Sequence, residues 1–260
     1  MTATQEQGLT QETIVSGLRD LGVQRGMLLA VHSSLSSLGW VQGGPETVIA
    51  ALMEVVGPEG TLVMPAQPMS LPMPLTPEEV AQGILWKLRR LDPDDPGPTG
   101  MGAIADAFRR RADVICGRGQ HRTCAWGRHA ERHAPGFCHL PADGGQVLLI
   151  GVGIQRCSCM HVAETDNIPE EIRALRRRPD ALAGPYPDDG WVVGYGPSCA
   201  ATWEAVWEEA VAAGDVHTML IGQATCHLFP AQAVVQRYAQ RLRADPYAAF
   251  GMRRSGESVE

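Results

Sequence analysis

Apolar positions along the first quarter of the chain follow helical and strand patterns in turn. Residues 14, 15, 18 and 21 are apolar at helical spacing and Gly22 follows them, which predicts a helix over Gln11–Leu21. A buried strand, a helix and a second buried strand are predicted next, at Met27–Val31, Pro45–Val56 and Thr61–Met64. This order is typical of parallel strands with a covering helix, so we predict an α/β fold with a mixed, largely parallel central sheet and flanking helices.

Further elements follow toward the end of the chain. The patterns predict helix Pro77–Leu91, helix Met101–Arg111, strand Val114–Ile115, helix Trp126–His133, strand Gln146–Gly153, strand Trp191–Tyr195, helix Ala200–Ala213, strand Thr218–Ala224 and helix Pro230–Ala244. Cys157–Glu164 is interpreted as a strand-to-helix turn with the start of a helix. Prolines concentrate between residues 65 and 98, which predicts a substrate-facing excursion from a single domain, 1–260.

Composition narrows the class of protein. With 44% hydrophobic and 20% charged residues, the 260-residue chain has ordinary globular composition. The net charge of −7 lacks the basic footprint of a nucleic-acid-binding protein, and it suits either a cationic small molecule or plain solubility. No apolar run reaches the roughly 18 residues that span a membrane, and the polar N-terminus lacks a signal-peptide core. We therefore expect a cytoplasmic protein without a membrane partner, as a monomer or homodimer.

The seven cysteines, at 116, 124, 138, 157, 159, 199 and 226, are odd in number and irregularly spaced. Because no secretion signal is present, we expect reduced thiols. Cys157, Cys159 and His161 could suggest a metal site, but the usual second pair of ligands is missing at the expected spacing. We predict no metal.

A serine- and glycine-rich segment, Val31–Gly44, lies between the first predicted strand and the helix that begins at Pro45. Backbone N–H groups, hydroxyls and a helix N-terminus can together cradle an anionic ligand such as a phosphate. A serine-rich turn that merely caps the helix fits the same residues. Local chemistry leaves both interpretations open.

His161 and Glu164 stand three residues apart, a spacing that places them on one face of a helix. A carboxylate beside an imidazole fixes its tautomer and stabilises the imidazolium. Such a pair suits a general base that takes a proton from an attacking amine. The same spacing also occurs in ordinary surface or core hydrogen bonds, so it does not decide the matter alone.

Four ordered blocks carry a resemblance to a known family. They are His32–Gly39 with Gly43–Pro45 and Gly57–Pro65, Gly100–Ala103 through Arg111, Leu148–Gly153 running into His161–Glu164, and Ile221–Ala224 with Asp245–Pro246. Over about Gly17–Phe250 the chain resembles the aminoglycoside 3-N-acetyltransferase family, also known as antibiotic N-acetyltransferases. The resemblance implies that family's α/β fold and an acetyl transfer from acetyl-CoA, as co-substrate, to an amine.

The resemblance also implies roles for particular residues. It makes His161 the general base and Glu164 its orienting or substrate-binding carboxylate. His32 is expected near the thioester or the pantetheine arm. The full set implied for the coenzyme is His32, Ser33, Ser34, Leu35, Ser36, Val41, Gly43, Gly44, Arg122 and Thr123.

The chain departs from the family in loops where the acceptor is expected to bind. Ala66–Met69 replaces a Thr/Ser-aromatic-Thr-like stretch, the element before Gly144 is shortened, and Thr165–Pro169 follows the His/Glu pair. Candidate acceptor-binding carboxylates near these loops are Asp94, Asp95, Asp166 and Glu170. We therefore expect a narrowed aminoglycoside range or a different amine.

The expected function is a coenzyme-A-dependent N-acetyltransferase that acts on an aminoglycoside-like, cationic amine. An acyltransferase of the same family for a non-aminoglycoside amine, and a coenzyme-A-binding protein without turnover, are the alternatives. A hydrolase with Cys157, Cys159 or a serine as nucleophile is a third, although no Gly-x-Ser-x-Gly elbow is present.

Overall fold

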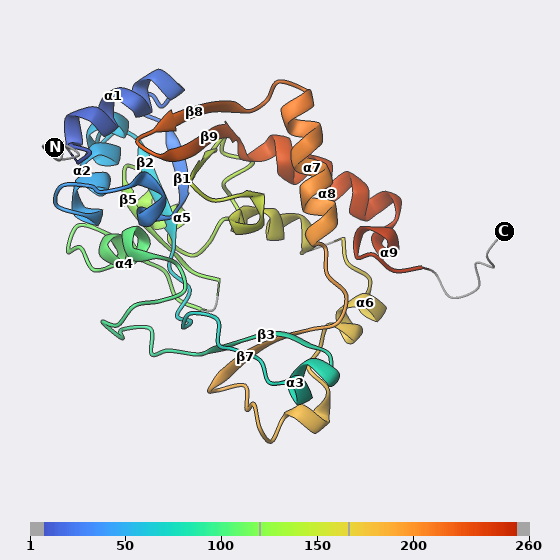
Figure 1. Cartoon of the computed structure of the whole chain (residues 1–260). Coiled ribbons are helices and arrows are strands. Elements are labelled where there is room, and N and C mark those ends of the chain that lie inside the picture. Colours follow the sequence, from blue (N-terminus) through green and yellow to red (C-terminus); the bar gives the residue numbers. More distant parts are fainter. Residues whose placement is uncertain (1–7, 120, 166, 254–260) are drawn as a thin grey trace, which may run out of the picture.

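The computed structural model describes residues 8–119, 121–165 and 167–253. A seven-stranded sheet runs through the body in the order β4-β5-β2-β1-β6-β9-β8 (Figure 1). Its strands are β1 (Leu28–Ser33), β2 (Thr61–Pro65), β4 (Ile115–Cys116), β5 (Thr123–Gly127), β6 (Gln146–Ile150), β8 (His217–Ile221) and β9 (Ala224–Pro230). β1 pairs in parallel with β2 and β6, and the outer strands pair antiparallel. The predicted α/β fold is confirmed, with its parallel strands at the centre of a mixed sheet.

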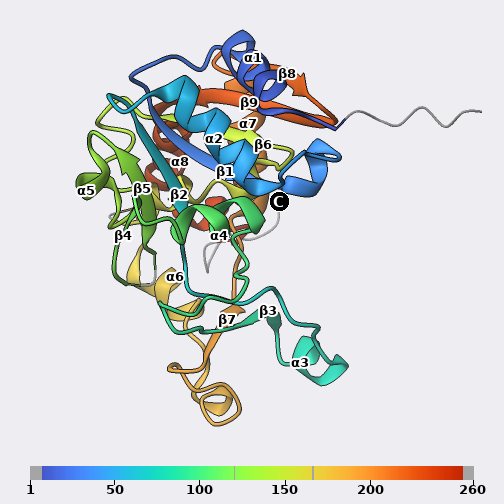
Figure 2. The same cartoon turned by 90° about the vertical axis from the view of Figure 1, so that its left-hand side faces the viewer.

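Helices cover both faces of this sheet (Figures 1 and 2). One face packs against α1 (Gln11–Leu21), α2 (Pro45–Val56) and α4 (Ala103–Arg109), and the other against α5 (Ala130–His133), the 3-10 helix η3 (Ser158–Glu164), α7 (Ala200–Ala212) and α8 (Ala231–Ala244). Shorter pieces are η1 (Leu35–Leu38), η2 (Ile154–Arg156), α6 (Glu170–Leu175), η4 (Asp180–Leu182) and α9 (Pro246–Ala249). Within the described ranges, every helix is too short or too polar to cross a bilayer.

Local sequence signals set the ends of the first helix. The Thr10 hydroxyl accepts a hydrogen bond from the Thr13 N–H (3.3 Å), which satisfies one free donor of the first turn. Gly22 ends α1 with a left-handed backbone (φ 109°). Its buried residues are the apolar positions that predicted it, and the predicted bounds of α1 and α2 agree with the structure.

A smaller part, here called the arm, projects from the body and has its own two-stranded antiparallel sheet (Figure 2). It comprises residues 66–98 and 176–198, with α3 (Pro77–Ala81), β3 (Ile84–Arg89) and β7 (Trp191–Tyr195). Inside the arm, Lys87 and Glu79 form a buried ion pair (2.5 Å), and the Tyr186 hydroxyl donates to Glu79. The proline-rich excursion therefore folds together with a second segment from much later in the sequence.

The helix predicted over Pro77–Leu91 is wrong beyond Ala81. Gly83 takes a left-handed backbone (φ 82°), and the chain continues as β3. β3 pairs with β7 on one side, while on the other the Met73 N–H donates to the Lys87 carbonyl (3.0 Å). Hydrogen bonds on both edges stabilise an extended backbone that the spacing of apolar residues did not predict.

Other predicted elements also have wrong bounds: the strand Gln146–Gly153 ends at Ile150, and the helix Met101–Arg111 is confined to Ala103–Arg109. Two more differ because strands pair there. Within the predicted helix Trp126–His133, the first two residues belong to β5, and the helix is confined to Ala130–His133. The strand predicted over Thr218–Ala224 ends at Ile221, and a tight turn leads into β9, which the pattern missed. In both places pairing with a central strand, β2 or β6, decides the conformation.

Cys116 and Cys124 form a disulfide between β4 and β5. The two residues are opposite each other in the antiparallel register. The expectation of reduced thiols is therefore wrong for this pair. The other cysteines are free thiols, namely Cys138, Cys157, Cys159, Cys199 and Cys226.

Candidate active site

The carboxyl ends of β1 and β6 lie side by side and lead into two loops. The Ser34 N–H, just after β1, donates to the Ile150 carbonyl at the end of β6 (2.9 Å). Such strand ends commonly form a crevice that binds ligands. A cavity of ≈ 380 Å³ at this edge is lined by Ser37, Gly151, Val152, Gly153, Gln223, Ala224, Thr225 and His227. Segments far apart in sequence thus meet around one hollow.

Close packing holds the serine loop against β6. Gly151 has a left-handed backbone (φ 61°), and a Cβ there would overlap the Ser37 side chain. The Ser37 hydroxyl donates to the Ser34 carbonyl (2.7 Å), and the Ser34 and Ser36 hydroxyls lie 3.1 Å apart within hydrogen-bonding distance. The loop thereby gathers hydroxyls beside the crevice.

The predicted coenzyme residues of this segment follow one another from β1 to α2. Ser33 ends β1, and Leu35 and Ser36 begin η1. Val41 is buried, and Gly43 and Gly44, with φ of 74° and 64°, lead into the first turn of α2. The structure therefore places the segment between a strand end and a helix N-terminus, as predicted; contact with a coenzyme stays a prediction.

His32 is fully buried near the end of β1. Its ring lies against Phe137, with centroids 5.5 Å apart. Burial lowers the pKa of His32 to about 4, so the imidazole is neutral at physiological pH. Its Nε2 has no partner among the described residues.

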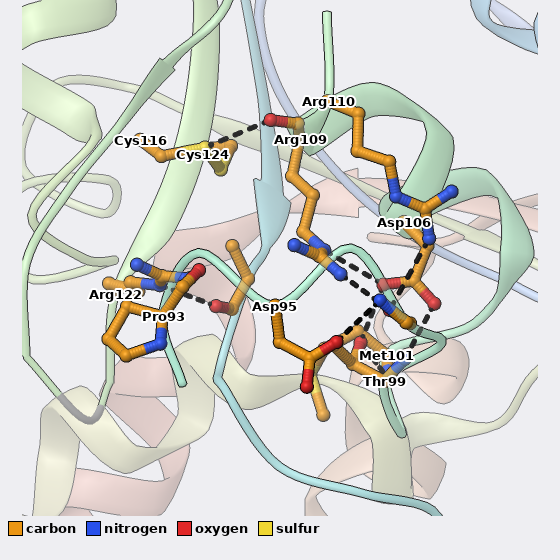
Figure 3. Close-up of polar contacts among 12 residues, drawn as sticks. Pro93, Asp95, Thr99, Met101, Asp106, Arg109, Arg110, Cys116, Arg122 and Cys124 are labelled. Atoms are coloured by element: carbon orange, nitrogen blue, oxygen red, sulfur yellow. Dashed lines mark hydrogen bonds and ion pairs between the residues drawn. A yellow bond between two sulfur atoms is a disulfide. The ribbon is translucent and has the colours of Figure 1, made fainter. Parts of the chain in front are cut away.

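Arg122 and Thr123 have structural partners. Arg122 Nε donates to the Ala66 carbonyl (2.8 Å) and Nη2 to the Pro93 carbonyl (2.6 Å) (Figure 3). The Thr123 hydroxyl is within hydrogen-bonding distance of the Ala134 carbonyl (3.0 Å). Backbone oxygens thus engage the donors of both residues, and contact of either with a coenzyme stays a prediction.

A second arginine holds the other end of the proline-rich segment (Figure 3). Arg109 Nη2 donates to the Gly97 carbonyl (2.7 Å), and its Nε donates to Asp106 (3.0 Å). Asp106 also accepts from the N–H (2.8 Å) and the hydroxyl (2.9 Å) of Thr99. The arm is therefore joined to the body through two buried arginines, Arg109 and Arg122.

His161 and Glu164 lie on η3, which follows β6 and packs against α8. The helix predicted to start here is a 3-10 helix. His161 Nδ1 is 3.1 Å from Glu164 Oε1. Burial alone would raise the pKa of Glu164, but the His161 hydrogen bond and the charges of His161 and Arg176 lower it to about 2. An ionised carboxylate can only accept, so Nδ1 donates; in the neutral form of this half-exposed histidine the lone pair is then on Nε2, which has no partner among the described residues.

Groups from several elements hold the Glu164 carboxylate. Oε1 accepts from His161, from the Tyr238 hydroxyl of α8 (3.2 Å) and from the Cys199 thiol (3.7 Å). Oε2 accepts from Arg176 Nη1 (3.2 Å). Sequence reasoning missed Tyr238, Cys199 and Arg176, because no local motif connects them with η3. Both oxygens are engaged, which favours the orienting role of Glu164 over substrate binding.

Two rings complete the surroundings of His161. The edge of Trp203 meets the imidazole with centroids 4.9 Å apart. His121, in the loop between β4 and β5, feels both members of the pair: burial and the charge of His161 lower its pKa, and the charge of Glu164 opposes them. His121 therefore lies near the same pair.

The candidate acceptor carboxylates are scattered. Glu170 is exposed and forms an ion pair with Arg177. Asp95 accepts a backbone N–H two residues on (2.6 Å), and Asp94 is exposed on the same loop of the arm. Asp166 lies outside the described residues. An acceptor role for these residues stays a prediction.

The cysteines near His161 are unsuited to nucleophilic chemistry. Cys157 and Cys159 are fully buried with their sulfurs 3.2 Å apart. The hydrogen bond with Cys157, together with burial, raises the pKa of Cys159 well above its usual value. Across the described ranges, no group of three or more His, Cys, Asp or Glu side chains could hold a metal ion.

The strand-end crevice, the serine loop and the His161/Glu164 pair lie together on a mixed α/β fold of the kind found in enzymes; the role of His161 as general base stays a prediction. Comparisons with known proteins identify the family: its sequence model, described as aminoglycoside 3-N-acetyltransferase, matches residues 30–243. The chain belongs to the aminoglycoside 3-N-acetyltransferase family.

Individual relatives agree with this assignment. The chain is 31% identical to aminoglycoside N(3)-acetyltransferase III of Salmonella sp over 87% of its own length and 88% of that protein. It is 36% identical to the SPbeta prophage-derived aminoglycoside N(3')-acetyltransferase-like protein YokD of Bacillus subtilis (strain 168), over 60% of this chain and 64% of that one. The solved structure of AAC-IIIb as a binary complex with CoASH shares the fold, with a TM-score of 0.66 at 21% identity over 96% and 99% of the two chains.

Proposed function

We propose that this chain transfers an acetyl group from acetyl-CoA to an amine of an aminoglycoside-like acceptor. The observation that carries the proposal is His161, whose Nδ1 is held by an ionised Glu164 while Nε2 is free to take a proton. Family membership supports the same reaction, since the relatives are named aminoglycoside N(3)-acetyltransferases.

The proposed step is a direct transfer. The amine nitrogen attacks the carbonyl carbon of the thioester, and His161 Nε2 takes the amine proton. The carbon–sulfur bond breaks, and the proton passes to the leaving thiolate, which departs as coenzyme A thiol. Glu164 stabilises the imidazolium formed in between. Backbone N–H groups stabilise the negative charge that develops on the carbonyl oxygen.

The coenzyme is proposed to lie along the serine loop and the hollow beside it. The hydroxyls of Ser34 and Ser36 and the N-terminus of α2 suit phosphate oxygens. His32, with a buried Nε2 that has no described partner, would serve the thioester end. The predicted set, without Arg122 and Thr123, forms this proposed site.

For the acceptor, we propose a cationic amine that binds between η3 and the arm. A polycation requires several carboxylates, and Asp94, Asp95, Asp166 and Glu170 remain the candidates. A non-aminoglycoside amine is the second candidate, because Glu170 is already paired with Arg177 and both Glu164 oxygens are engaged. A cytoplasmic location, and a monomer or homodimer, also remain predictions.

The test is an assay of thiol release from acetyl-CoA with a panel of aminoglycosides and then of other amines. His161→Ala is expected to lower transfer by about 10²-fold or more, because a general base contributes about 10²–10⁴. His217→Ala, on the exposed start of β8, is the control and should match the wild type. Unchanged turnover in His161→Ala would refute its role as base.

Binding without turnover is tested separately. Ser34→Phe is expected to weaken acetyl-CoA binding in calorimetry by at least tenfold, since the ring would fill the space proposed for the coenzyme. Unaltered affinity would remove the serine loop from that site. Tight coenzyme binding by the wild type without transfer to any amine would favour the alternative of a binding protein.

A further inference from the structure

Arg176 meets the oxygen of Glu164 that points away from His161. Its Nη1 lies 3.2 Å from Oε2, while the imidazole is bound to Oε1 (3.1 Å). The carboxylate thus stands between a fixed positive charge and the base. The Glu164 side chain is 12% exposed, whereas those of Arg176 and His161 are 33% and 47% exposed, so solvent screens the three charges in part.

A carboxylate beside a histidine has two opposing effects on a general base: it raises the basicity of the imidazole, but it also favours the protonated ring before the amine attacks. An adjacent negative charge stabilises the imidazolium, which holds the proton that the base must lack when the amine attacks. A base is most effective when its neutral form is populated at the working pH. An orienting carboxylate therefore needs its charge offset if the histidine is to stay free of a proton.

We infer that Arg176 balances the charge of Glu164, so that the carboxylate orients His161 without holding it in its protonated form. The inference rests on the proposed function, in which His161 is the base. Arg176 acts through Glu164 and is a positioning residue rather than a catalytic one.

The fold holds Arg176 in this place. It is the residue at the C-terminal end of α6, with its N–H bonded to the Ile172 carbonyl (3.2 Å). Its guanidinium lies over the Phe250 ring, 4.9 Å from the centroid, and Phe250 is buried just after α9. A cation over an aromatic face is attracted to it, so the C-terminal part of the chain helps to aim the arginine.

The other titratable groups that face the pair cannot supply this charge. Tyr238 and Cys199 contact Oε1, and burial raises the pKa of both, so they are neutral donors. His121 has a lowered pKa, because of burial and the charges of His161 and Arg90. Arg176 is the cation in direct contact with Glu164 among the described residues.

The experiment compares the wild type with single and double variants of Arg176 and Glu164. The titration of the His161 imidazole is followed by NMR in the whole protein without substrate, and its signal is assigned as the one that disappears in His161→Gln. Arg176→Gln is expected to move the titration midpoint up by about one pH unit, because the carboxylate charge is then unopposed. Glu164→Gln should move it down, and the double variant should return close to the wild type. Arg241→Gln removes the same charge from an exposed pair with Glu209 and should leave the midpoint in place.

The kcat/KM profile provides the second reading. In Arg176→Gln the midpoint of the acid limb of the kcat/KM profile should move up by about one pH unit. Activity should therefore fall about tenfold at low pH and little at high pH. Arg176→Lys should return the midpoint to its wild-type position. A midpoint that stays in place or moves down in Arg176→Gln overturns the inference. So does a kcat/KM lowered equally at every pH. Because the NMR titration needs no substrate, it tests the charge balance even if the proposed acetyl transfer is wrong.

Discussion

The body and the arm are stabilised by different interactions. In the body, alternating residues of the central strands pack into two apolar cores, one on each face of the sheet. The arm buries few apolar side chains, among them Ile84 of β3, and relies more on polar groups: Glu79, Lys87 and Tyr186 meet inside it, and two buried arginines fasten it to the body. Large apolar side chains of the arm remain exposed, namely Leu71, Met73, Val80, Leu85 and Trp86.

The sequence pattern reveals elements that bury an apolar face more readily than elements held by polar groups. Burial of one apolar face imposes a period on the sequence, and that period predicted α1, α2, β1 and β2. Hydrogen bonds from arginines to carbonyls impose no period, since any backbone oxygen serves. The arm was therefore mispredicted where its conformation depends on partners distant in sequence.

The largest loss of stability is expected when a buried side chain of the body is truncated and leaves a cavity. Leu148→Ala removes a fully buried side chain of β6 and should lower the free energy of unfolding by about 2–5 kcal/mol, because lost burial and the remaining cavity add. Urea unfolding followed by circular dichroism measures it. A loss below about 1 kcal/mol would show that the central sheet does not depend on this core.

A smaller loss of stability, confined to the arm, is expected when Arg122, which joins the arm to the body, is replaced. Arg122→Gln removes charged donors from the Ala66 and Pro93 carbonyls, which should favour local opening by about 1.5–3 kcal/mol. Hydrogen exchange of β3 and β7 should then quicken by roughly 10- to 100-fold, while β1 and β6 keep their protection. Arg110→Gln is the control, since this exposed residue makes a single long bond (3.4 Å) to Gly97. Equal quickening in the body would mean that the two parts open together.

His32 makes the free energy of unfolding of the body depend on pH. Burial lowers its pKa from 6.5 to about 4 in the folded protein, so between these values the unfolded chain binds a proton that the folded one does not. Its contribution to stability is full above pH 6.5 and is lost as the pH falls toward 4. At pH 5 the loss should be about 2 kcal/mol relative to pH 7.5.

The measurement for His32 is urea unfolding at the two pH values, with His32→Phe as the comparison. The variant should lack this part of the pH dependence, whatever its stability at pH 7.5. If the wild type and the variant lose the same amount between pH 7.5 and 5, the imidazole is not the group responsible.

The residues of the site, like the elements of the fold, differ in whether the sequence predicts them. His161 and Glu164 were found from the sequence because they stand three positions apart within a family motif, and a family motif also marked the serine loop. Arg176, Cys199 and Tyr238 reach Glu164 from α6, α7 and α8. Nothing local marks them, since their meeting depends on how these helices pack. Arg122 shows what a motif leaves out: its contact with a phosphate stays a prediction, whereas the hydrogen bonds of its guanidinium to the Ala66 and Pro93 carbonyls could not be predicted from the sequence.

The smallest effect is expected from the exposed apolar face of the arm. Leu85 is 51% exposed on β3, so Leu85→Ser should change the free energy of unfolding by less than about 0.5 kcal/mol. Its neighbour Trp86 differs, because its indole covers Gly194 of β7 so closely that a Cβ there would overlap the ring. Gly194→Ala should therefore loosen the β3–β7 pair, seen as faster hydrogen exchange in the arm, whereas Leu85→Ser leaves exchange unchanged. A loss above about 1 kcal/mol in Leu85→Ser would contradict the comparison, since it would mean that the arm too depends on apolar burial.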